Sequence, residues 1–294
     1  MGLVTTKELL SSCSRDWAVG AFNINNLDDI QAVINAGEEL QSPVILQVSE
    51  GVAKHIGVEL VAAICCTAGN IASIPVAVHL DHCHSASLAI QCMRHGFTSV
   101  MIDGSSLPFE ENVALTKQVV EVARLFGASV EGELGRVGGT EDDLVVDDAS
   151  LTVPEEAARF VELTGIDVLA PSIGTLHGTY KAKPHLDFER LQTISERVPV
   201  PLALHGGSGL TEEQFKECIR HGIAKINIGT DIKKVQIAAT RHYLENNPNK
   251  AEPRPLSKTI QVAVSETVKE KIRLFGSMDK AMIWGFDASK ARGS

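Results

Sequence analysis

Eight short apolar stretches rich in β-branched residues alternate with eight stretches of helical periodicity, and this alternation limits the possible folds more than any other feature. The predicted strands cover residues 19–23, 43–49, 76–80, 99–103, 129–134, 167–171, 201–205 and 225–228. The predicted helices cover residues 27–40, 58–71, 86–95, 110–126, 154–164, 186–198, 212–221 and 231–246. Strands that alternate with helices indicate βαβ units and a parallel sheet.

Eight such units predict an α/β fold, a closed TIM (β/α)8 barrel, rather than a doubly wound open sheet. The length of 294 residues is normal for one barrel, so residues 1–294 are expected to form a single barrel domain. A further pattern at 256–274 predicts an added C-terminal helix. The longest strand-to-helix connection, 135–153, contains two adjacent glycines and several acids and is predicted to be a mobile loop.

Composition narrows the classes of partner. Hydrophobic residues make up 44% and charged residues 22%, a balance typical of a protein that buries a large core in water. No apolar run approaches a membrane span and no signal segment begins the chain, so a cytoplasmic protein that binds no membrane is expected. The net charge of −10 argues against nucleic-acid binding, which needs a basic surface, but permits a locally bound phosphate.

The six cysteines lack the spacing of a disulfide framework, so free thiols are expected. Cys83 stands between two histidines and could be a metal ligand. Adjacent residues at a strand end point in opposite directions, which favours a bystander role instead.

Reactive residues cluster where the predicted strands end, which is where the active sites of TIM barrels lie. Three histidines, His82, His177 and His205, follow three different strands. Three imidazoles with one open coordination position form a catalytic zinc site, in which the metal polarises a carbonyl. A strand-capping role for each histidine is the alternative. His84 lies further into its loop and is a weaker candidate.

Carboxylates surround these histidines. Asp103 and Glu133 could form a second metal position, or they could accept hydrogen bonds that orient the histidines. Glu131 lies deeper on the same strand face as Glu133, where a structural ion pair is expected. Asp81, beside His82, is suited to proton transfer. Glu141, on the glycine-containing loop, could deliver a second proton, or it could be a solvated acid.

Two glycine-containing segments follow the seventh and eighth strands, where many TIM barrels bind a phosphate. Their backbone N–H groups and a helix N-terminus favour an anion. Gly178 and Lys181 could close the pocket from the side, and Ser49 could offer its hydroxyl to the site or cap its strand. The predicted phosphate ligands of the two segments are Gly206, Gly207, Ser208, Asn227, Ile228, Gly229 and Thr230.

Five ordered motifs make the chain resemble the class II ketose-bisphosphate aldolases, which include the fructose-1,6- and tagatose-1,6-bisphosphate enzymes. The motifs are His79 to His82, Glu131 to Gly135 with Gly138-Gly139, His177-Gly178, His205 to Gly209, and Asn227 to Asp231. The resemblance covers nearly the whole chain. Three departures, at Gly132, Cys83 and Thr140, remove no catalytic group but leave the substrate open.

The resemblance implies a role for each matching residue. Asp81 matches the catalytic proton donor and acceptor, and Glu141 matches the loop acid. His82, His177 and His205 match the zinc ligands, and Asp103 and Glu133 match acids at an alternative metal position. Gly178, Gly206 to Ser208 and Asn227 to Thr230 match the dihydroxyacetone-phosphate site, which often also holds Na⁺ or K⁺. Arg254 matches an arginine that reaches a neighbouring subunit, so a homodimer or homotetramer is expected.

The expected function is zinc-dependent, reversible cleavage of fructose or tagatose 1,6-bisphosphate to dihydroxyacetone phosphate and glyceraldehyde 3-phosphate. Another phosphorylated ketose, such as a deoxy-keto-gluconate or sulfo-sugar phosphate, is an alternative substrate. A metal-dependent hydrolase using His82 and His84, a Schiff-base aldolase using Lys225, and a non-catalytic barrel are the alternative functions.

Overall fold

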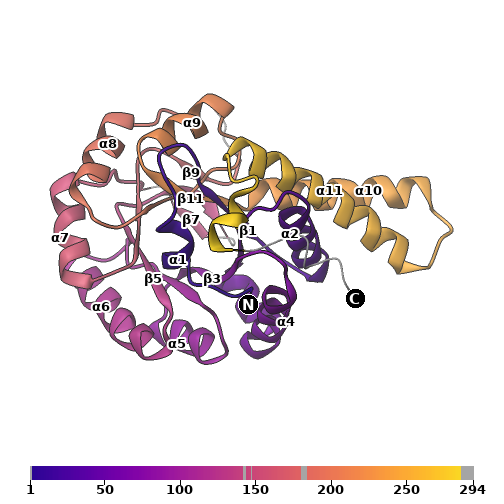
Figure 1. Ribbon diagram of the computed structural model, residues 1–294, viewed down its shortest axis with the longest axis horizontal. Helices are drawn as coiled ribbons and strands as arrows, with labels where there is room; N and C mark the ends of the chain where they lie inside the picture. Colours follow the sequence, from indigo (N-terminus) through magenta and orange to yellow (C-terminus); the bar gives the residue numbers. More distant parts are fainter. Residues whose placement is uncertain (1, 142–143, 147, 180–183, 286–294) are drawn as a thin grey trace.

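Eight parallel strands close into a barrel in the computed structural model, which describes residues 2–141, 144–146, 148–179 and 184–285 (Figure 1). The predicted (β/α)8 fold is thereby confirmed. The strands are neighbours in the order β1-β11-β10-β8-β5-β4-β3-β2. Their bounds are β1 Val19–Asn23, β2 Val44–Ser49, β3 Val76–Cys83, β4 Ser99–Ile102, β5 Ser129–Leu134, β8 Val168–Pro171, β10 Leu202–Leu204 and β11 Ile223–Ile228.

Helices surround the barrel, and the predicted C-terminal helix is present (Figure 1). It begins at Pro253, three residues earlier than predicted, with Glu252 capping its first turn and proline at a first-turn position. The bounds are α1 Thr6–Leu10, α2 Leu27–Glu39, α3 Glu50–Ile56, α4 Val58–Ile71, α5 Ala86–Arg94, α6 Phe109–Phe126, α7 Pro154–Thr164, α8 Phe188–Arg197, α9 Glu212–Arg220, α10 Thr230–Asn246, α11 Pro253–Leu274 and the 3-10 helix Lys280–Trp284.

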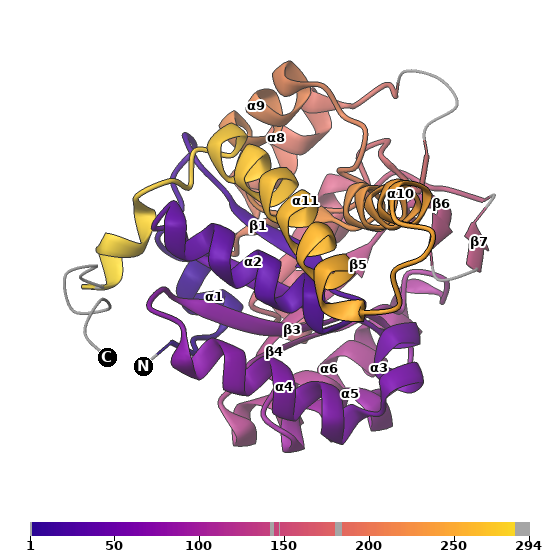
Figure 2. The ribbon, with the colours of Figure 1, turned by 90° about the vertical axis from the view of Figure 1, so that its right-hand side faces the viewer.

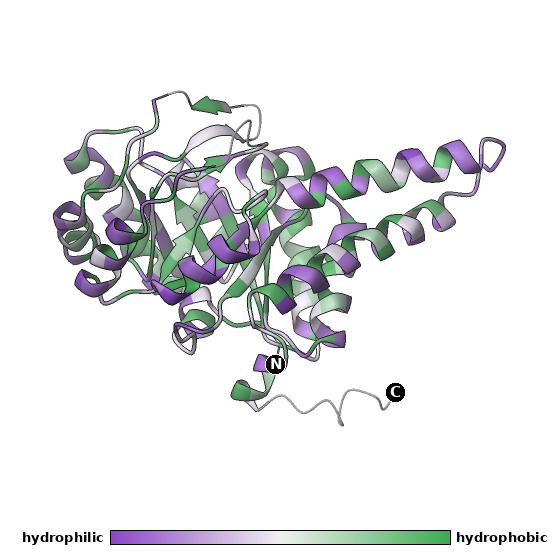
Figure 3. Cartoon of the chain, turned by 90° about the horizontal axis from the view of Figure 1, so that it is seen from above, coloured by the Kyte–Doolittle hydropathy of each residue, from purple (hydrophilic) through white to green (hydrophobic). Residues whose placement is uncertain are grey.

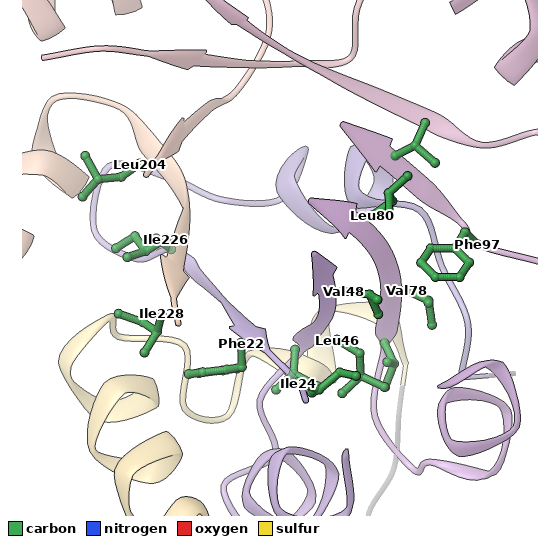
Figure 4. Close-up of a cluster of buried hydrophobic side chains, with 14 of the residues drawn as sticks. Phe22, Ile24, Leu46, Val48, Val78, Leu80, Phe97, Leu204, Ile226 and Ile228 are labelled. Atoms are coloured by element: carbon green, nitrogen blue, oxygen red, sulfur yellow. The ribbon is translucent and has the colours of Figure 1, made fainter. Parts of the chain in front are cut away.

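The core has two layers because successive strand residues point to opposite faces of the sheet. In β2, Leu46 and Val48 pack outward against the helices, as Figure 4 shows, whereas Ile45 belongs to the smaller cluster inside the barrel. In β3 the same alternation turns His79 and Asp81 inward. Apolar side chains fill most of the lower barrel, where Ser99 and Ser129 are buried polar exceptions, and the upper part carries the polar groups described below.

Helix α1, which the periodicity did not predict, closes the N-terminal end of the barrel. Its Leu9 and Leu10 belong to the inner apolar cluster. Thr6 hydrogen-bonds to Ser99 and Ser129, the first residues of β4 and β5. In Figure 2 this helix and the N-terminus lie on the side opposite β6 and β7.

The long connection 135–153 contains regular structure where a loop was predicted. Strands β6, Gly138–Glu141, and β7, Leu144–Val146, form an antiparallel pair, and β6 also pairs with β9, Leu176–His177. This small sheet was missed because its strands have two to four residues and β6 begins with two glycines. The pairing of Gly139 with His177 ties the connection to a predicted metal ligand.

Helices α10 and α11 form a hairpin that extends away from the barrel (Figures 1 and 3). Apolar side chains are exposed along it, namely Ile237, Leu244 and Val262. Within the described residues, no single helix is long and apolar enough to cross a membrane; only α3 and α4 taken together, bent by 105°, have sufficient length and composition.

Candidate active site

The end of β3 departs from regular strand geometry so that two consecutive residues serve the same mouth of the barrel. The β3–β4 pairing shifts register between Leu80 and Cys83, and His82 has φ of 44°. A left-handed conformation costs a non-glycine residue about 1 kcal/mol or more. It breaks the alternation of the strand, and Asp81 and His82 both contact polar groups at the barrel mouth. Backbone strain of this kind concentrates at functional sites.

Asp81 is held by amide groups from three neighbouring strands. Its Oδ2 accepts hydrogen bonds from Asn23 Nδ2 at 3.0 Å and Gln47 Nε2 at 2.9 Å, and its Oδ1 accepts from Asn227 Nδ2 at 3.3 Å. The carboxyl is fully buried. Three donors fix its orientation, so it can exchange a proton with a group placed above it.

The three predicted histidine ligands converge. Their ring centroids are 4.8 Å apart for His82 and His177, 4.5 Å for His82 and His205, and 5.9 Å for His177 and His205. One nitrogen from each lies within 4.8 Å of the others, a spacing that could hold a metal ion. Burial, with His82 next, lowers the pKa of His177 and His205, which keeps these rings neutral as metal ligands require.

Two carboxylates accept hydrogen bonds from the ring nitrogens of His82 and His205 that point away from each other, called the outer nitrogens below. Asp103 Oδ2 accepts from His82 Nδ1 at 2.9 Å, and Glu131 Oε1 accepts from His205 Nε2 at 2.8 Å. Burial alone would raise the pKa of both acids. Hydrogen bonds from His82 and Ser105 instead hold the pKa of Asp103 below its usual range. The charge of Lys225 and a hydrogen bond from His205 do the same for the pKa of Glu131. Both acids are therefore ionised and only accept.

The other nitrogen of each ring, the inner one, therefore carries a lone pair, and the two lone pairs point at each other. His82 Nε2 and His205 Nδ1 are 2.7 Å apart. With the outer nitrogen of each ring protonated toward its carboxylate, two neutral rings would place two lone pairs in contact. A proton or a metal cation between them removes this repulsion.

Glu133 brings a carboxylate oxygen close to the rings of His82 and His205. Its Oε2 is buried without a hydrogen-bond partner among the described residues, 3.6 Å from His205 Nδ1 and 3.8 Å from His82 Nδ1. Burial and then the Asp103 charge raise the pKa of Glu133 well above its usual value. With His82 and Asp103 it forms a second group that could hold a metal. This donor set suits a divalent cation.

Lys225 is committed to an ion pair inside the barrel. Its Nζ lies 2.9 Å from Glu131 Oε2 and 3.4 Å from His79 Nε2, and all three side chains are fully buried. An ammonium group held by a carboxylate is not a nucleophile, so the geometry gives no support to a Schiff base at Lys225. The predicted structural ion pair of Glu131 is present, and Glu131 also orients His205.

A cavity of about 490 Å³ lies between the glycine-containing segments. Gly206 has φ of 66°, and a Cβ there would lie 2.5 Å from the Leu176 carbonyl oxygen, so only glycine fits. The cavity borders the N-terminus of α10, which favours an anion. Its lining includes the predicted residues Gly178, Gly206, Gly207, Ser208, Asn227, Gly229 and Thr230, together with Asn23 and Lys233.

A second cavity, of about 570 Å³, opens on the other side of His177. Its wall contains His82, Asp103 and Glu133, and its outer part includes Lys54 and Arg136. Lys54 pairs with Glu50, and Arg136 pairs with Asp148. His177 thus lines both cavities, and His82 lines this one.

Several other predicted residues lie elsewhere. The side chain of Ile228 packs in the outer core and lines neither cavity, because strand alternation turns it outward (Figure 4). Its predicted place in the phosphate-binding segment concerns the backbone and stays a prediction. Ser49 caps α3 because its side chain accepts a hydrogen bond from Val52 N, and it too lines neither cavity. Arg254 is exposed near the tip of the α10–α11 hairpin and pairs with Glu252.

Lys181 lies outside the described residues. Glu141 is placed by its backbone at the end of β6, two residues beyond Gly139. His84 is outside the histidine trio, half-exposed and 3.4 Å from Glu50. The Cys83 thiol is buried in the outer core, burial raises its pKa to about 12, and it belongs to neither group that could hold a metal.

The sequence prediction omitted Asn23 and Gln47 and named His79 only within a motif, without a role. All three contact the site from inside the barrel. Each is a polar residue at an inward position of its strand. The inward and outward alternation of strand residues could have indicated that these side chains enter the barrel, but it does not specify what each side chain contacts.

Comparison with known proteins agrees with this geometry. The family model described as "Fructose-bisphosphate aldolase class-II" matches residues 4–280. The D-tagatose-1,6-bisphosphate aldolase subunit GatY of Klebsiella oxytoca is 45% identical over 94% of this chain and 98% of its own. A fructose-bisphosphate aldolase of Staphylococcus epidermidis is 44% identical over 96% of this chain and 100% of its own. The crystal structure of the YdjI aldolase from Escherichia coli K12 superimposes with a TM-score of 0.85 at 35% identity, covering 95% of this chain and 99% of that one. The converging strand-end histidines, together with these likenesses, lead to one conclusion: the chain belongs to the class II fructose-bisphosphate aldolase family of lyases.

Proposed function

We propose that the protein catalyses the zinc-dependent, reversible aldol cleavage of fructose or tagatose 1,6-bisphosphate. The products are dihydroxyacetone phosphate and glyceraldehyde 3-phosphate. The observation that carries the proposal is the meeting of His82 Nε2 and His205 Nδ1 at 2.7 Å, in a group with His177 that could hold a metal ion. Fructose and tagatose 1,6-bisphosphate are named because the similar aldolases are named for these substrates.

The donor set fits zinc. His82, His177 and His205 would hold the ion, which supplies a Lewis acid that polarises the ketose carbonyl and stabilises the negative charge developing on its oxygen. Asp103 and Glu131 fix the tautomers of two of these rings, as outer hydrogen-bond partners of metal-bound histidines commonly do. Glu133 Oε2, buried and without a hydrogen-bond partner among the described residues, supports a second resting position for the ion.

Asp81 would act as the base. Its carboxylate takes the proton of the C4 hydroxyl, the C3–C4 bond breaks, and the bonding electrons pass to C3 and the C2 carbonyl. Glyceraldehyde 3-phosphate leaves with the new C4 aldehyde. Glu141 would return a proton to C3 and complete dihydroxyacetone phosphate. The β6–β9 pairing supports this role, because it ties the strand of Glu141 to that of His177.

The cavity between the glycine-containing segments would hold the phosphate of the dihydroxyacetone half. Backbone N–H groups around Gly206 to Ser208, the N-terminus of α10 and Lys233 offer positive potential there. We also propose Na⁺ or K⁺ beside this phosphate, and Lys181 as a further contact.

Cleavage of fructose and tagatose 1,6-bisphosphate should be measured side by side, before EDTA, after EDTA and after zinc is restored. We expect one epimer to be cleaved faster and zinc to recover the lost activity. His177→Ala should abolish this recovery, whereas His55→Ala, at an exposed position of α3, should retain it. Failure with both epimers would contradict the substrate and direct the screen to other phosphorylated ketoses. Activity after complete metal removal would contradict the zinc site.

We further propose a homodimer or homotetramer in which Arg254 serves a neighbouring site. Arg254 is exposed on a hairpin that projects from the barrel, beside exposed apolar residues, which supports this role. Mixing Arg254→Ala with Asp81→Asn protein tests it, because a mixed dimer has one site with both residues intact. Random exchange would restore roughly a quarter of the sites. No recovery after verified exchange would place Arg254 in its own site or in none.

A further inference from the structure

A line of buried polar side chains crosses the barrel from α1 to the candidate metal ligands. Thr6 Oγ1 lies 2.8 Å from Ser99 Oγ, which lies 2.7 Å from His79 Nδ1. His79 Nε2 lies 3.4 Å from Lys225 Nζ, and Lys225 pairs with Glu131 at 2.9 Å. All five side chains are fully buried.

The chemistry of the participants determines the direction of each hydrogen bond. The ammonium group of Lys225 only donates, so His79 Nε2 accepts and its Nδ1–H donates to Ser99. The Ser99 hydroxyl then donates to Thr6, and Thr6 donates to Ser129 at 2.7 Å. Burial, with the Lys225 charge next, lowers the pKa of His79 well below its usual value, in agreement with one ring proton.

The upper end of the line reaches His205. Lys225 contacts both oxygens of Glu131, at 2.9 and 3.2 Å, and Glu131 Oε1 accepts from His205 Nε2 at 2.8 Å. Because Glu131 takes this proton, His205 presents the lone pair of Nδ1 to His82. The rotamer and tautomer of His205 therefore depend on where Lys225 holds Glu131.

An apolar filling would stabilise the barrel at least as well, since buried charges cost several kcal/mol that their pairing only partly returns. The rest of the lower interior is filled in that way, by the apolar residues of the inner cluster. The polar line is therefore not required by packing.

We infer that Thr6, Ser99 and His79 are positioning residues of the metal site, which hold Lys225, and through it Glu131, so that His205 keeps Nδ1 directed at the ion. The inference rests on the zinc site proposed above. It extends the support of that site to α1, at the closed end of the barrel.

Zinc affinity of the metal-free protein, measured by competition with a chromophoric chelator, tests the inference without relying on turnover. Loss of a direct carboxylate partner of a metal ligand typically costs 10–100-fold in affinity. Thr6→Val and Ser99→Ala break the line further away, so each should weaken zinc binding about 3–10-fold. The double variant should lose no more than the worse single one, because both break the same line. Thr6→Ser should retain wild-type affinity.

Thr5→Ala is the matched control. Thr5 caps α1 by accepting from Glu8 N, and its removal should cost about 1 kcal/mol of stability without touching the line. We expect a lower Tm and a zinc affinity within twofold of wild type. An equal loss of affinity in Thr5→Ala would overturn the inference, because general loosening of α1 would then explain all the effects.

The remaining outcomes separate the two proposals. Unchanged zinc affinity in Thr6→Val and Ser99→Ala would overturn the positioning role and leave the zinc site standing. A wild-type protein that binds no zinc would overturn both. NMR of ¹⁵N-histidine-labelled metal-free wild type needs no variant: it should show His79 protonated on Nδ1 and His205 on Nε2. The opposite tautomer at His79 would overturn the inference.

Discussion

His82 and His205 bring two imidazole nitrogens to 2.7 Å of each other, although the opposite nitrogen of each ring already donates to a carboxylate. The carboxylates of Asp103 and Glu131 therefore select the nitrogens that a bound metal would contact. The outer hydrogen bonds matter as much as the ligands themselves, because a ring with the other tautomer would present an N–H where the metal needs a lone pair.

Asp103→Asn should weaken zinc binding by about 10–100-fold. The amide can turn its NH₂ toward His82 Nδ1, which would move the ring proton to the nitrogen that faces His205. Chelator competition on the metal-free protein measures the loss. Asp28→Asn, which changes an acid bound to Gln261 on the helical surface, is the control and should keep its affinity. A loss of less than twofold in Asp103→Asn would contradict the tautomer argument.

Asp81→Asn should lower kcat by about 10²–10⁴-fold, the usual contribution of a positioned general base. The amide oxygen can still accept from Asn23 and Gln47, so we expect a folded protein with unchanged zinc stoichiometry. Steady-state cleavage assays and metal analysis of the same preparation provide both readouts. If kcat falls by less than tenfold, another group must take the C4 hydroxyl proton.

Stability of the metal-free protein should depend on pH through His177, whose pKa burial lowers well below its ordinary value. Below about pH 6.5 the unfolded histidine takes up a proton that the folded one does not, so folding loses free energy as pH falls. The contribution is at most about 1.4 kcal/mol per pH unit.

The His177→Asn variant lacks this penalty. Its free energy of unfolding relative to wild type should increase between pH 7 and pH 5, as measured by urea denaturation with EDTA present. A relative stability that stays constant over this range would mean that His177 titrates normally in the folded state.

Gly206→Ala should damage the cavity proposed to hold the phosphate. Its φ of 66° already disfavours alanine, and the new Cβ would collide with the Leu176 carbonyl. We expect KM for the bisphosphate to rise tenfold or more, with a loss of stability above 1 kcal/mol. Gly127→Ala has nearly the same φ, 65°, but meets nothing within 4 Å. It isolates the backbone cost of about 1 kcal/mol and should leave KM unchanged. Equal effects of the two substitutions would exclude a specific role for Gly206.

The barrel and the gathering of its reactive residues could be predicted from the sequence because both follow from local patterns. Alternating apolar runs specify parallel strands, and parallel strands direct their carboxyl ends to one mouth. Asp81, His82, His177 and His205 each follow a strand, so their convergence needed no knowledge of contacts. The roles of these residues remain predictions until the experiments above are done.

The hydrogen-bond partners were decided by the tertiary structure. Asp103 and His82 are 21 residues apart, Glu131 and His205 are 74 apart, and Asn227 and Asp81 are 146 apart. A sequence pattern places each residue on an inward face, but the shape of the closed barrel determines which inward residues meet.

The sequence by itself therefore determined the fold class and the mouth at which the chemistry is concentrated, because strand and helix periodicity are local properties of the chain. The tertiary structure alone decided the left-handed turn at His82, the β6–β9 pairing and the buried line from Thr6 to His205. Each of these depends on how strands that are distant in the chain are aligned with one another, and this strand register is set when the whole barrel closes.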